Sequence, residues 1–153
     1  MMDGAREIEN LIYTYAERID SGDLEGVANL FAHGRILPSP DAPAAATFEG
    51  RDAVLGMYEA ATRIYEDTGT PKTRHVTTNC IIEVGEDGQS GRARSYYTVF
   101  QGTDVLPLQP IIAGHYHDTF QRIDDTWWFD TRTIFIDLVG DLSQHLLYDL
   151  GSV

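Results

Sequence analysis

The sequence predicts an α+β fold in which three N-terminal helices pack on a strongly curved, mainly antiparallel sheet. Over about the first 66 residues, apolar side chains recur with the 3.6-residue period of amphipathic helices. After residue 70 the period falls toward two, and β-branched and aromatic residues become frequent. Helices followed by a run of strands that can form hairpins are typical of the α+β class.

Three segments have the helical pattern. The first covers residues 5–19, with an apolar stripe formed by Ile8, Leu11, Ile12, Tyr15 and Ile19. The stretch "DSGD" at 20–23 interrupts it, and Asp23 is a suitable N-cap for a second helix, whose apolar face is Leu24, Val27, Ala28 and Phe31. A loop rich in proline and alanine follows at 38–46. Residues 51–66 then predict the third helix.

Four strands are expected near 72–84, 91–101, 111–122 and 127–138. The stretches "EDG" at 86–88 and "IDDT" at 123–126 favour tight turns between neighbouring strands. Residues 103–110 form a longer connection. We expect the loop 38–46 and the tail from 137 onward to flank the mouth of any pocket, and His145 in that tail to lie on the surface.

Composition limits the kinds of partner. With 153 residues, the chain suits a single domain covering 1–153. Lys and Arg number 11 and Asp and Glu number 24, so the formal charge is −13. This argues against nucleic acid or an anionic membrane surface as partner, because both require a basic footprint.

The N-terminal stretch "MMDGAREIEN" lacks the basic segment and apolar run of a signal peptide. Cys80 is the only cysteine, so no intrachain disulfide can form. A cytoplasmic, reduced location is the expectation from these two features.

His75 is an unusual residue for the first strand, "KTRHVTTNCIIEV" at 72–84, which is otherwise dense in β-branched side chains. If the hairpin turns at Asp87-Gly88, partner numbers sum to 175, and Glu83 faces Arg92 as an opposite-charge pair. In that register one face carries His75, Thr77, Asn79, Tyr96, Thr98 and Phe100. A mixed polar and aromatic wall suits a ligand pocket.

Further candidates come from the later strands and the third helix. Tyr116 and Asp118 alternate on one face of the third strand, and Arg132 lies on the fourth. An inward Asp118–Arg132 pair could be a structural ion pair or could bind substrate. Tyr58 is first of all a core residue that could reach the pocket.

His115 and His117 should point to the opposite, outward face of the third strand. Two histidines at i, i+2 can bind a metal, but no third ligand is evident, so no metal site is predicted.

Three stretches together resemble the SnoaL-like branch of the NTF2-like superfamily: "YAERIDSGDLEGVANLFA" (15–32), "TRHVTTNCIIEV" (73–84) and "GHYHDTFQRIDDTWWFDTRTIFID" (114–137). The members most similar in motif are scytalone dehydratase, hexachlorocyclohexane dehydrochlorinase and bile acid 7α-dehydratase. The resemblance covers nearly the whole chain and implies a cone of bent sheet and three helices around an apolar pocket.

The resemblance also implies catalytic roles. In the lyase members a strand histidine abstracts a proton and an aspartate after the first helix orients it, and the matching positions are His75 and Asp20. Tyr15 matches the position at which the bile acid enzyme has a tyrosine. The second pocket histidine of scytalone dehydratase would fall near Phe100, so its function is expected to be absent here.

The resulting hypothesis is a cofactor-independent, dehydratase-type lyase that acts on an apolar cyclic substrate. An isomerase or cyclase on the same scaffold would share the proton chemistry. A non-catalytic small-molecule binder or scaffold subunit is the alternative from a different class, since one fold hosts many functions. We also expect a homo-oligomer, a dimer or trimer, assembled through an apolar outward sheet face that includes Tyr97 and Val99.

Overall fold

The structure is a computed structural model that describes residues 3–150. It contains three α-helices, α1 (Gly4–Asp20), α2 (Leu24–Asn29) and α3 (Gly50–Ala61), and one turn of 3₁₀ helix at Ala44–Ala46. The strands are β1 (Arg35–Leu37), β2 (Phe48–Glu49), β3 (Thr73–Val84), β4 (Ser90–Gln101), β5 (Gln109–Ile123) and β6 (Thr126–Val139). The predicted helices and long strands are therefore confirmed, while the two short strands β1 and β2 were missed and α3 ends earlier than expected.

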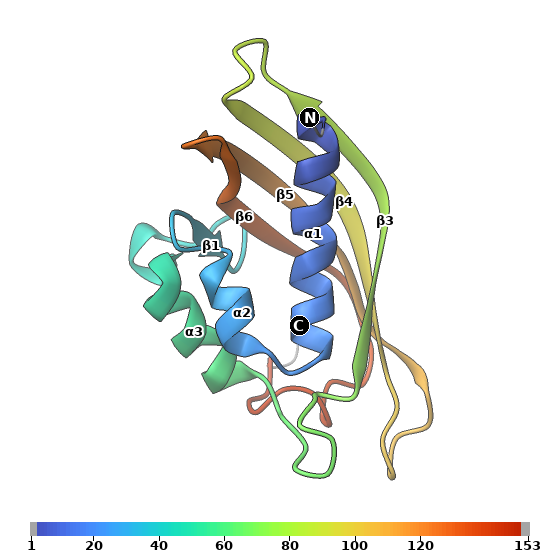
Figure 1. The fold of residues 1–153 in the computed structure, drawn as a ribbon. Helices are drawn as coiled ribbons and strands as arrows, with labels where there is room; N and C mark the ends of the chain where they lie inside the picture. Colours follow the sequence, from blue (N-terminus) through green and yellow to red (C-terminus); the bar gives the residue numbers. More distant parts are fainter. Residues whose placement is uncertain (1–2, 151–153) are drawn as a thin grey trace.

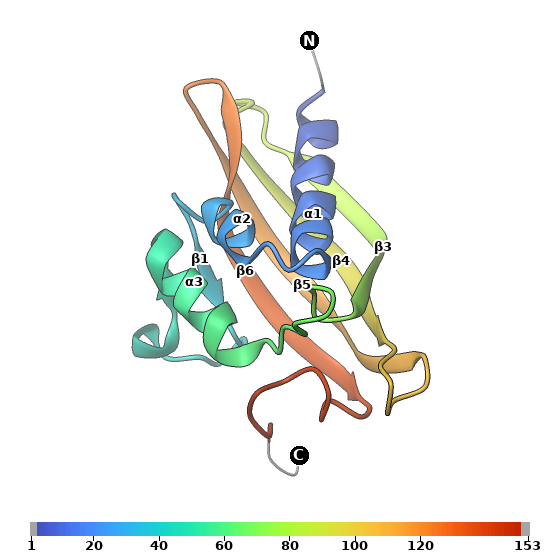
Figure 2. The ribbon, with the colours of Figure 1, turned by 60° about the horizontal axis from the view of Figure 1, so that its bottom comes forward.

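The strands form one six-stranded sheet in the order β2-β1-β6-β5-β4-β3. All neighbours pair antiparallel except β1 and β6, which are parallel. The long strands curl around α1, which lies along their inner face, and α2 and α3 lie side by side at the β1 end (Figures 1 and 2). The predicted α+β fold, with helices on a curved and mainly antiparallel sheet, is confirmed.

Local sequence explains where α1 begins and ends. The Asp3 carboxylate accepts a hydrogen bond from the backbone N–H of Ala5 at the N-terminus. At the C-terminus Gly22 has φ +79°, and the N–H groups of Gly22 and Asp23 donate to the carbonyls of Ile19 and Arg18. This pattern is a Schellman motif. It fixes the last helical turn, and Asp20 is the final residue of that turn.

The β5–β6 hairpin also follows from its sequence. Ile123 pairs with Thr126, and the two residues between them, Asp124 and Asp125, have φ of 48° and 65°. Two consecutive positive φ angles are characteristic of a type I′ turn, whose twist matches that of the flanking strands. The turn predicted at 123–126 is thus confirmed with its expected short loop.

The register between β3 and β4 departs from the expectation partway along the strand. Glu83 faces Arg92 as predicted, but His75 faces Val99 instead of Phe100. The cause is a β-bulge between Thr78 and Ile81, in which Asn79 has φ +52°. Because a slip of one residue exchanges the two faces of a strand, every predicted facing pair before the bulge is shifted.

The core lies between α1 and the inner sheet face. From α1 it receives Ile8, Ile12, Tyr15 and Ile19, the stripe that the helical period predicts. The sheet contributes aromatic side chains, among them Phe120, Trp127 and Phe129. No helix in the described part of the chain combines the length and the apolar character needed to cross a membrane.

Candidate active site

An apolar cavity of about 830 Å³ opens between α1, α3, the inner sheet face and the C-terminal tail. Its volume falls in the range of small-molecule sites. The residues on its wall that carry polar side-chain atoms are Tyr15, Asp52, Tyr58, Thr62, His75, Tyr97, Tyr116, His145 and Tyr148. Pro38 and Ala46 of the predicted mouth loop and Leu142 of the tail also line it, so both segments border the cavity as expected.

His75 and Asp20 meet at the edge of this cavity. The Nδ1 atom of His75 lies 2.6 Å from Oδ1 of Asp20, and their side chains are only 9% and 14% exposed. A neutral imidazole bonded in this way carries its proton on Nδ1, because the carboxylate can only accept. Nε2 is then the unprotonated nitrogen, and His75 itself lines the cavity.

Asp20 is held by β3 through more than the imidazole. Its carboxylate also accepts from the backbone N–H of His75 at 2.8 Å and from the Thr73 hydroxyl at 2.9 Å. An aspartate in the last turn of a helix is electrostatically unfavourable, since the helix C-terminus carries partial negative charge. These three hydrogen bonds from β3 compensate for that position, and they fix the orientation of the His75 ring.

Tyr15 and Tyr58 form a second polar group on the wall. Their hydroxyl groups are hydrogen-bonded to each other, joining α1 to α3. Burial raises the pKa of Tyr58 well above its ordinary value, so this phenol stays protonated. Tyr116 closes the wall beside Tyr15, with ring centroids 6.0 Å apart, and burial raises its pKa too. Tyr15, Tyr58 and Tyr116 all line the cavity, as the sequence predicted.

Asp118 and Arg132 form the inward pair that was expected from their strand positions. Nε and Nη2 of Arg132 donate to the two carboxylate oxygens at 2.8 and 2.9 Å, and neither side chain is exposed. The guanidinium stacks on the rings of Tyr116 and Tyr15 at 3.7 and 4.1 Å. The pair supports the tyrosine wall from behind and does not line the cavity, which favours the structural interpretation over substrate binding.

Four predicted pocket residues lie elsewhere: Asn79, Tyr96, Thr98 and Phe100. Asn79 forms the bulge, and the other three point to the outer face of β4, where Tyr96 is 55% exposed. The bulge in β3 places His75 on the same face as Tyr97 and Val99 of β4, and all three line the cavity. The expectation that Tyr97 and Val99 belong to an outward face is therefore wrong for the same reason. The signal that could have revealed the shift is Asn79 itself, since asparagine tolerates positive φ.

His145 is the functional candidate that sequence reasoning missed. It was expected on the surface, but it lines the same cavity as His75. Burial, followed in size by the effect of nearby His75, lowers the pKa of His145 to about 4, so its ring is neutral at pH 7. No sequence pattern in the tail distinguishes this histidine from an exposed one.

The outer face of the sheet carries His115 and His117, as predicted. His115 bonds through Nδ1 to Asp137 at 2.6 Å, and His117 is exposed. Across residues 3–150, no three His, Cys, Asp or Glu side chains gather closely enough to hold a metal ion. That the protein works without a cofactor stays a prediction.

Comparison with known proteins places this chain. Residues 2–133 match the family described as the SnoaL-like domain. The chain belongs to the SnoaL-like family. This family includes polyketide cyclases and dehydratase-like enzymes. A search of curated proteins returned no match.

Solved structures of this fold agree with the assignment. A proposed scytalone dehydratase from Novosphingobium aromaticivorans has a TM-score of 0.69 at 22% identity, over 97% of this chain and 93% of that one. A Nostoc punctiforme protein of unknown function with a cystatin-like fold has a TM-score of 0.70 at 20% identity, over 90% of this chain and 93% of that one. ActVI-ORFA from Streptomyces coelicolor has a TM-score of 0.66 at 20% identity, over 86% of this chain and 96% of that one. At these identities the likeness shows that the fold is shared.

Proposed function

We propose that this SnoaL-like protein is a dehydratase-type lyase, which removes a proton from an apolar cyclic substrate with His75 as the base. The observation that carries the proposal is the 2.6 Å contact between His75 Nδ1 and Asp20 at the wall of an 830 Å³ apolar cavity. A neutral imidazole is a suitable general base near pH 7. The carboxylate fixes its tautomer and stabilises the imidazolium that forms.

The proposed step is a β-elimination. Nε2 of His75 takes the proton from a carbon next to a carbonyl group, the C–H electron pair becomes the new C=C bond, and the C–O bond to the leaving hydroxyl breaks. The imidazolium then returns its proton to the hydroxyl, which leaves as water, so the enzyme ends in its starting state. No external oxidant, reductant or metal is part of this balance.

The tyrosine wall has a role in the same step. Negative charge develops on the substrate carbonyl as the proton leaves, and a pre-oriented hydroxyl that donates to this oxygen stabilises the transition state. Tyr15 is suited to this task, because its hydroxyl is held by Tyr58 and its ring rests on the Arg132 guanidinium. Tyr15→Phe should therefore slow the reaction without altering the His75–Asp20 contact.

Two alternatives differ from the proposal in what they predict. An isomerase or cyclase would use the same proton abstraction but would release no water, so the product distinguishes it. A non-catalytic binder or scaffold subunit has no need for an oriented imidazole at its cavity wall. The hydrogen bonds that Asp20 accepts from the His75 backbone and ring therefore favour an enzyme.

The test begins with ligands that copurify with the protein, identified by mass spectrometry. The identified compound is then incubated with the enzyme in D₂O, and incorporation of deuterium and loss of water are followed. His75→Ala should reduce both by on the order of 10² to 10⁴-fold. Asp20→Asn should also reduce them, because the amide cannot stabilise the imidazolium as a carboxylate does.

The matched control is His117→Ala, an exposed histidine on the outer sheet face. This variant should retain wild-type rates. If His75→Ala keeps nearly full exchange and turnover while it remains folded, the catalytic role proposed for this histidine is wrong.

A further inference from the structure

The exposed residues of the cavity wall mark its mouth. Most residues that line the cavity are buried or half-buried, but Ile136 of β6 is 45% exposed and Tyr148 of the tail is 53% exposed. Of the large apolar side chains that are exposed in residues 3–150, these two are the ones that line the cavity. The apolar wall therefore continues past the enclosed space and ends in contact with water.

The α3 side of the mouth offers space. Ala53, Gly56 and Ala60 line the cavity and are exposed, and a Cβ atom added at Gly56 would meet nothing within 4 Å. Glycine inside a helix is less favourable than alanine, and no close approach of another group explains its presence at position 56. These small residues leave room for a ligand group to pass over α3 at the mouth.

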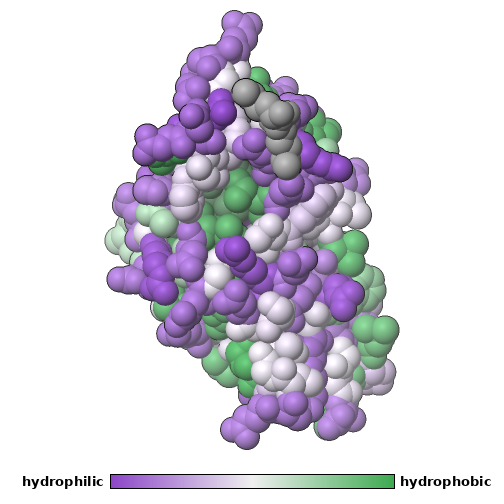
Figure 3. All heavy atoms as spheres, in the orientation of Figure 1, coloured by the Kyte–Doolittle hydropathy of each residue, from purple (hydrophilic) through white to green (hydrophobic). Residues whose placement is uncertain are grey.

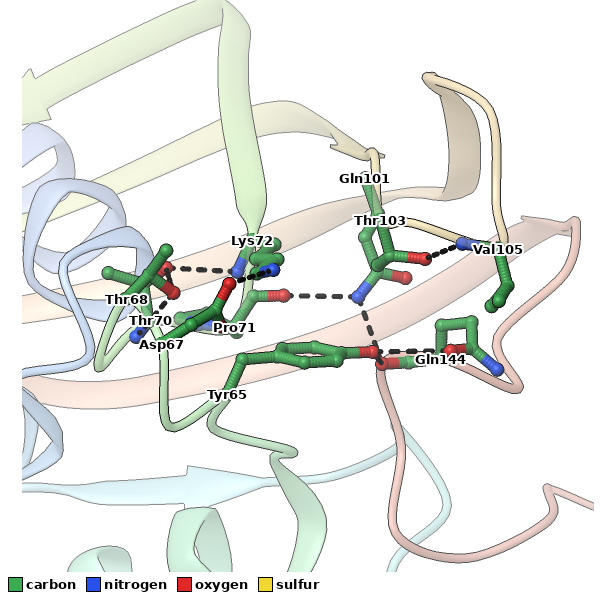
Figure 4. A network of polar contacts seen from close by, with 10 residues as sticks. All are labelled: Tyr65, Asp67, Thr68, Thr70, Pro71, Lys72, Gln101, Thr103, Val105 and Gln144. Carbon is green, nitrogen blue, oxygen red and sulfur yellow. Dashed lines mark hydrogen bonds and ion pairs between the residues drawn. The ribbon is translucent and has the colours of Figure 1, made fainter.

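Tyr148 is brought to the mouth by the main chain of the tail. The Gln144 carbonyl accepts from the Tyr65 hydroxyl at 2.6 Å (Figure 4). The N–H of Leu147, the residue directly before Tyr148, donates to the Ala61 carbonyl of α3 at 2.9 Å. Because these contacts come from residues that precede Tyr148, its side chain is free to contact a ligand.

We propose that the substrate carries an uncharged apolar extension, such as an alkyl chain or a further ring, which leaves the cavity at this mouth and lies against Ile136 and Tyr148. The inference deepens the proposed function, on which it rests for the reaction at His75. The ring that loses the proton stays inside the cavity, and the extension covers the apolar surface at the mouth. Covering such surface is favourable roughly in proportion to its area.

The charges at the cavity favour a neutral extension. Asp52 of α3 lines the cavity with its side chain 96% exposed, whereas no Lys or Arg in residues 3–150 lines it. A carboxylate or phosphate on the extension would be repelled by Asp52 and by a chain whose formal charge is −13. An apolar group meets no such repulsion.

The experiment uses 2-naphthyl ketones whose alkyl chain lengthens from methyl to propyl to pentyl. None of them carries a leaving group, so calorimetry or fluorescence measures binding without elimination. In wild type, each added methylene group should raise the affinity by about two- to fourfold until the chain extends beyond the mouth. Ile136→Thr and Tyr148→Ser should each reduce this increase, because they remove apolar surface at the mouth, and should bind the methyl ketone like wild type.

Matched controls exist on the same two segments. Leu138 of β6 and Leu147 of the tail are 70% and 49% exposed, and neither lines the cavity. Leu138→Thr and Leu147→Ser should therefore keep the full increase along the series. Binding of the methyl ketone also shows that a variant is folded. Should Ile136→Thr lose it, Tyr148→Ser decides the question, because the contacts that anchor the tail precede this residue.

The inference is overturned if wild type fails to bind the series, if it binds the three ketones equally, or if a folded Ile136→Thr or Tyr148→Ser keeps the full increase. A full increase together with a lower mass in sedimentation would show that the exposed pair contacts a second copy of the chain instead.

Failure of this inference is distinct from failure of the proposed function. The ketones report on the mouth alone, since they undergo no elimination. Loss of turnover in His75→Ala would uphold the base however the ketones bind. Full activity of His75→Ala would refute the base and leave the result at the mouth unchanged.

Discussion

Two acid–base pairs on the inner side of the sheet, Asp20–His75 and Asp118–Arg132, differ in burial, and this difference separates their roles. The Asp20–His75 pair lies at the cavity with both side chains slightly exposed, and one ring nitrogen is not engaged by the carboxylate. The Asp118–Arg132 pair is completely enclosed, and its geometry is bidentate. A pair that can meet a ligand suits chemistry, whereas an enclosed pair supports its surroundings, here the stacked rings of Tyr15 and Tyr116.

Removing one partner of the enclosed pair should be strongly destabilising. Asp118→Ala leaves the Arg132 guanidinium buried without its counter-charge, and we expect the free energy of unfolding to fall by about 3–5 kcal/mol. Urea denaturation at pH 7 measures this. The double variant Asp118→Leu, Arg132→Met should be more stable than Asp118→Ala, because no uncompensated charge is left inside. A double variant that is no more stable would mean that the stacking of Arg132 on the tyrosines matters more than its charge.

At the level of elements, the bulge in β3 decides which side chains face the cavity. Asn79 and Cys80 together oppose Ser95, since Thr78 pairs with Tyr96 and Ile81 with Arg94. The extra residue turns His75 toward α1 and Asp20, onto the face that Tyr97 occupies on the neighbouring strand. Without the bulge, alternation from the hairpin would pair His75 with Phe100, and both side chains would lie on the outer face of the sheet, away from the cavity.

Substitution at the bulge tests this directly. Asn79→Val places a β-branched side chain at φ +52°, and we expect a loss of stability of about 1–2 kcal/mol. Asn79→Gly is the matched control, because glycine adopts positive φ without strain and should be neutral or slightly stabilising. Thermal and urea unfolding of both variants give the comparison. Equal stability of the two variants would show that the left-handed conformation at this position is not required.

For the whole molecule, the two faces of the sheet differ in character. The face that carries the helices is mainly hydrophilic on its surface, with apolar residues in separate patches (Figure 3). The outer sheet face has exposed apolar side chains on three strands: Val76, Ile81, Tyr96 and Leu138. Exposed apolar surface of this kind is typical of interaction sites. The proposal of self-association through this face is therefore kept, with these residues in place of Tyr97 and Val99.

We expect a dimer or trimer in sedimentation velocity at micromolar concentration, well above the mass of the 17.1 kDa chain. Tyr96→Glu should shift the protein toward monomer, because it buries a charge in the contact. Val105→Glu is the control, since Val105 is 75% exposed in the β4–β5 connection. A wild-type protein that sediments only as monomer would rule out assembly through the outer face.

The sequence by itself determined the elements and several contacts within them. Its two periodicities placed the helices and long strands, "DSGD" ended α1 beside Asp20, and Asp118 and Arg132 were matched by strand alternation. These features depend on residues that are close in the sequence, or on the regular pairing of neighbouring strands. The pairing of Asp20 with His75 was predicted from the resemblance to the family. In the structure, His75 Nδ1 lies 2.6 Å from Asp20 Oδ1.

Only the tertiary structure decided which face of β3 and β4 lines the cavity and which histidine joins His75 there. The face depends on the φ angle of one residue, Asn79, and alternation of residue types does not encode a one-residue insertion in the pairing. His145 reaches the cavity because Tyr65, Gln101 and the end of α3 hold the tail through its backbone. Backbone contacts between segments far apart in the chain leave no mark in side-chain periodicity, so the second histidine became visible only in the folded molecule.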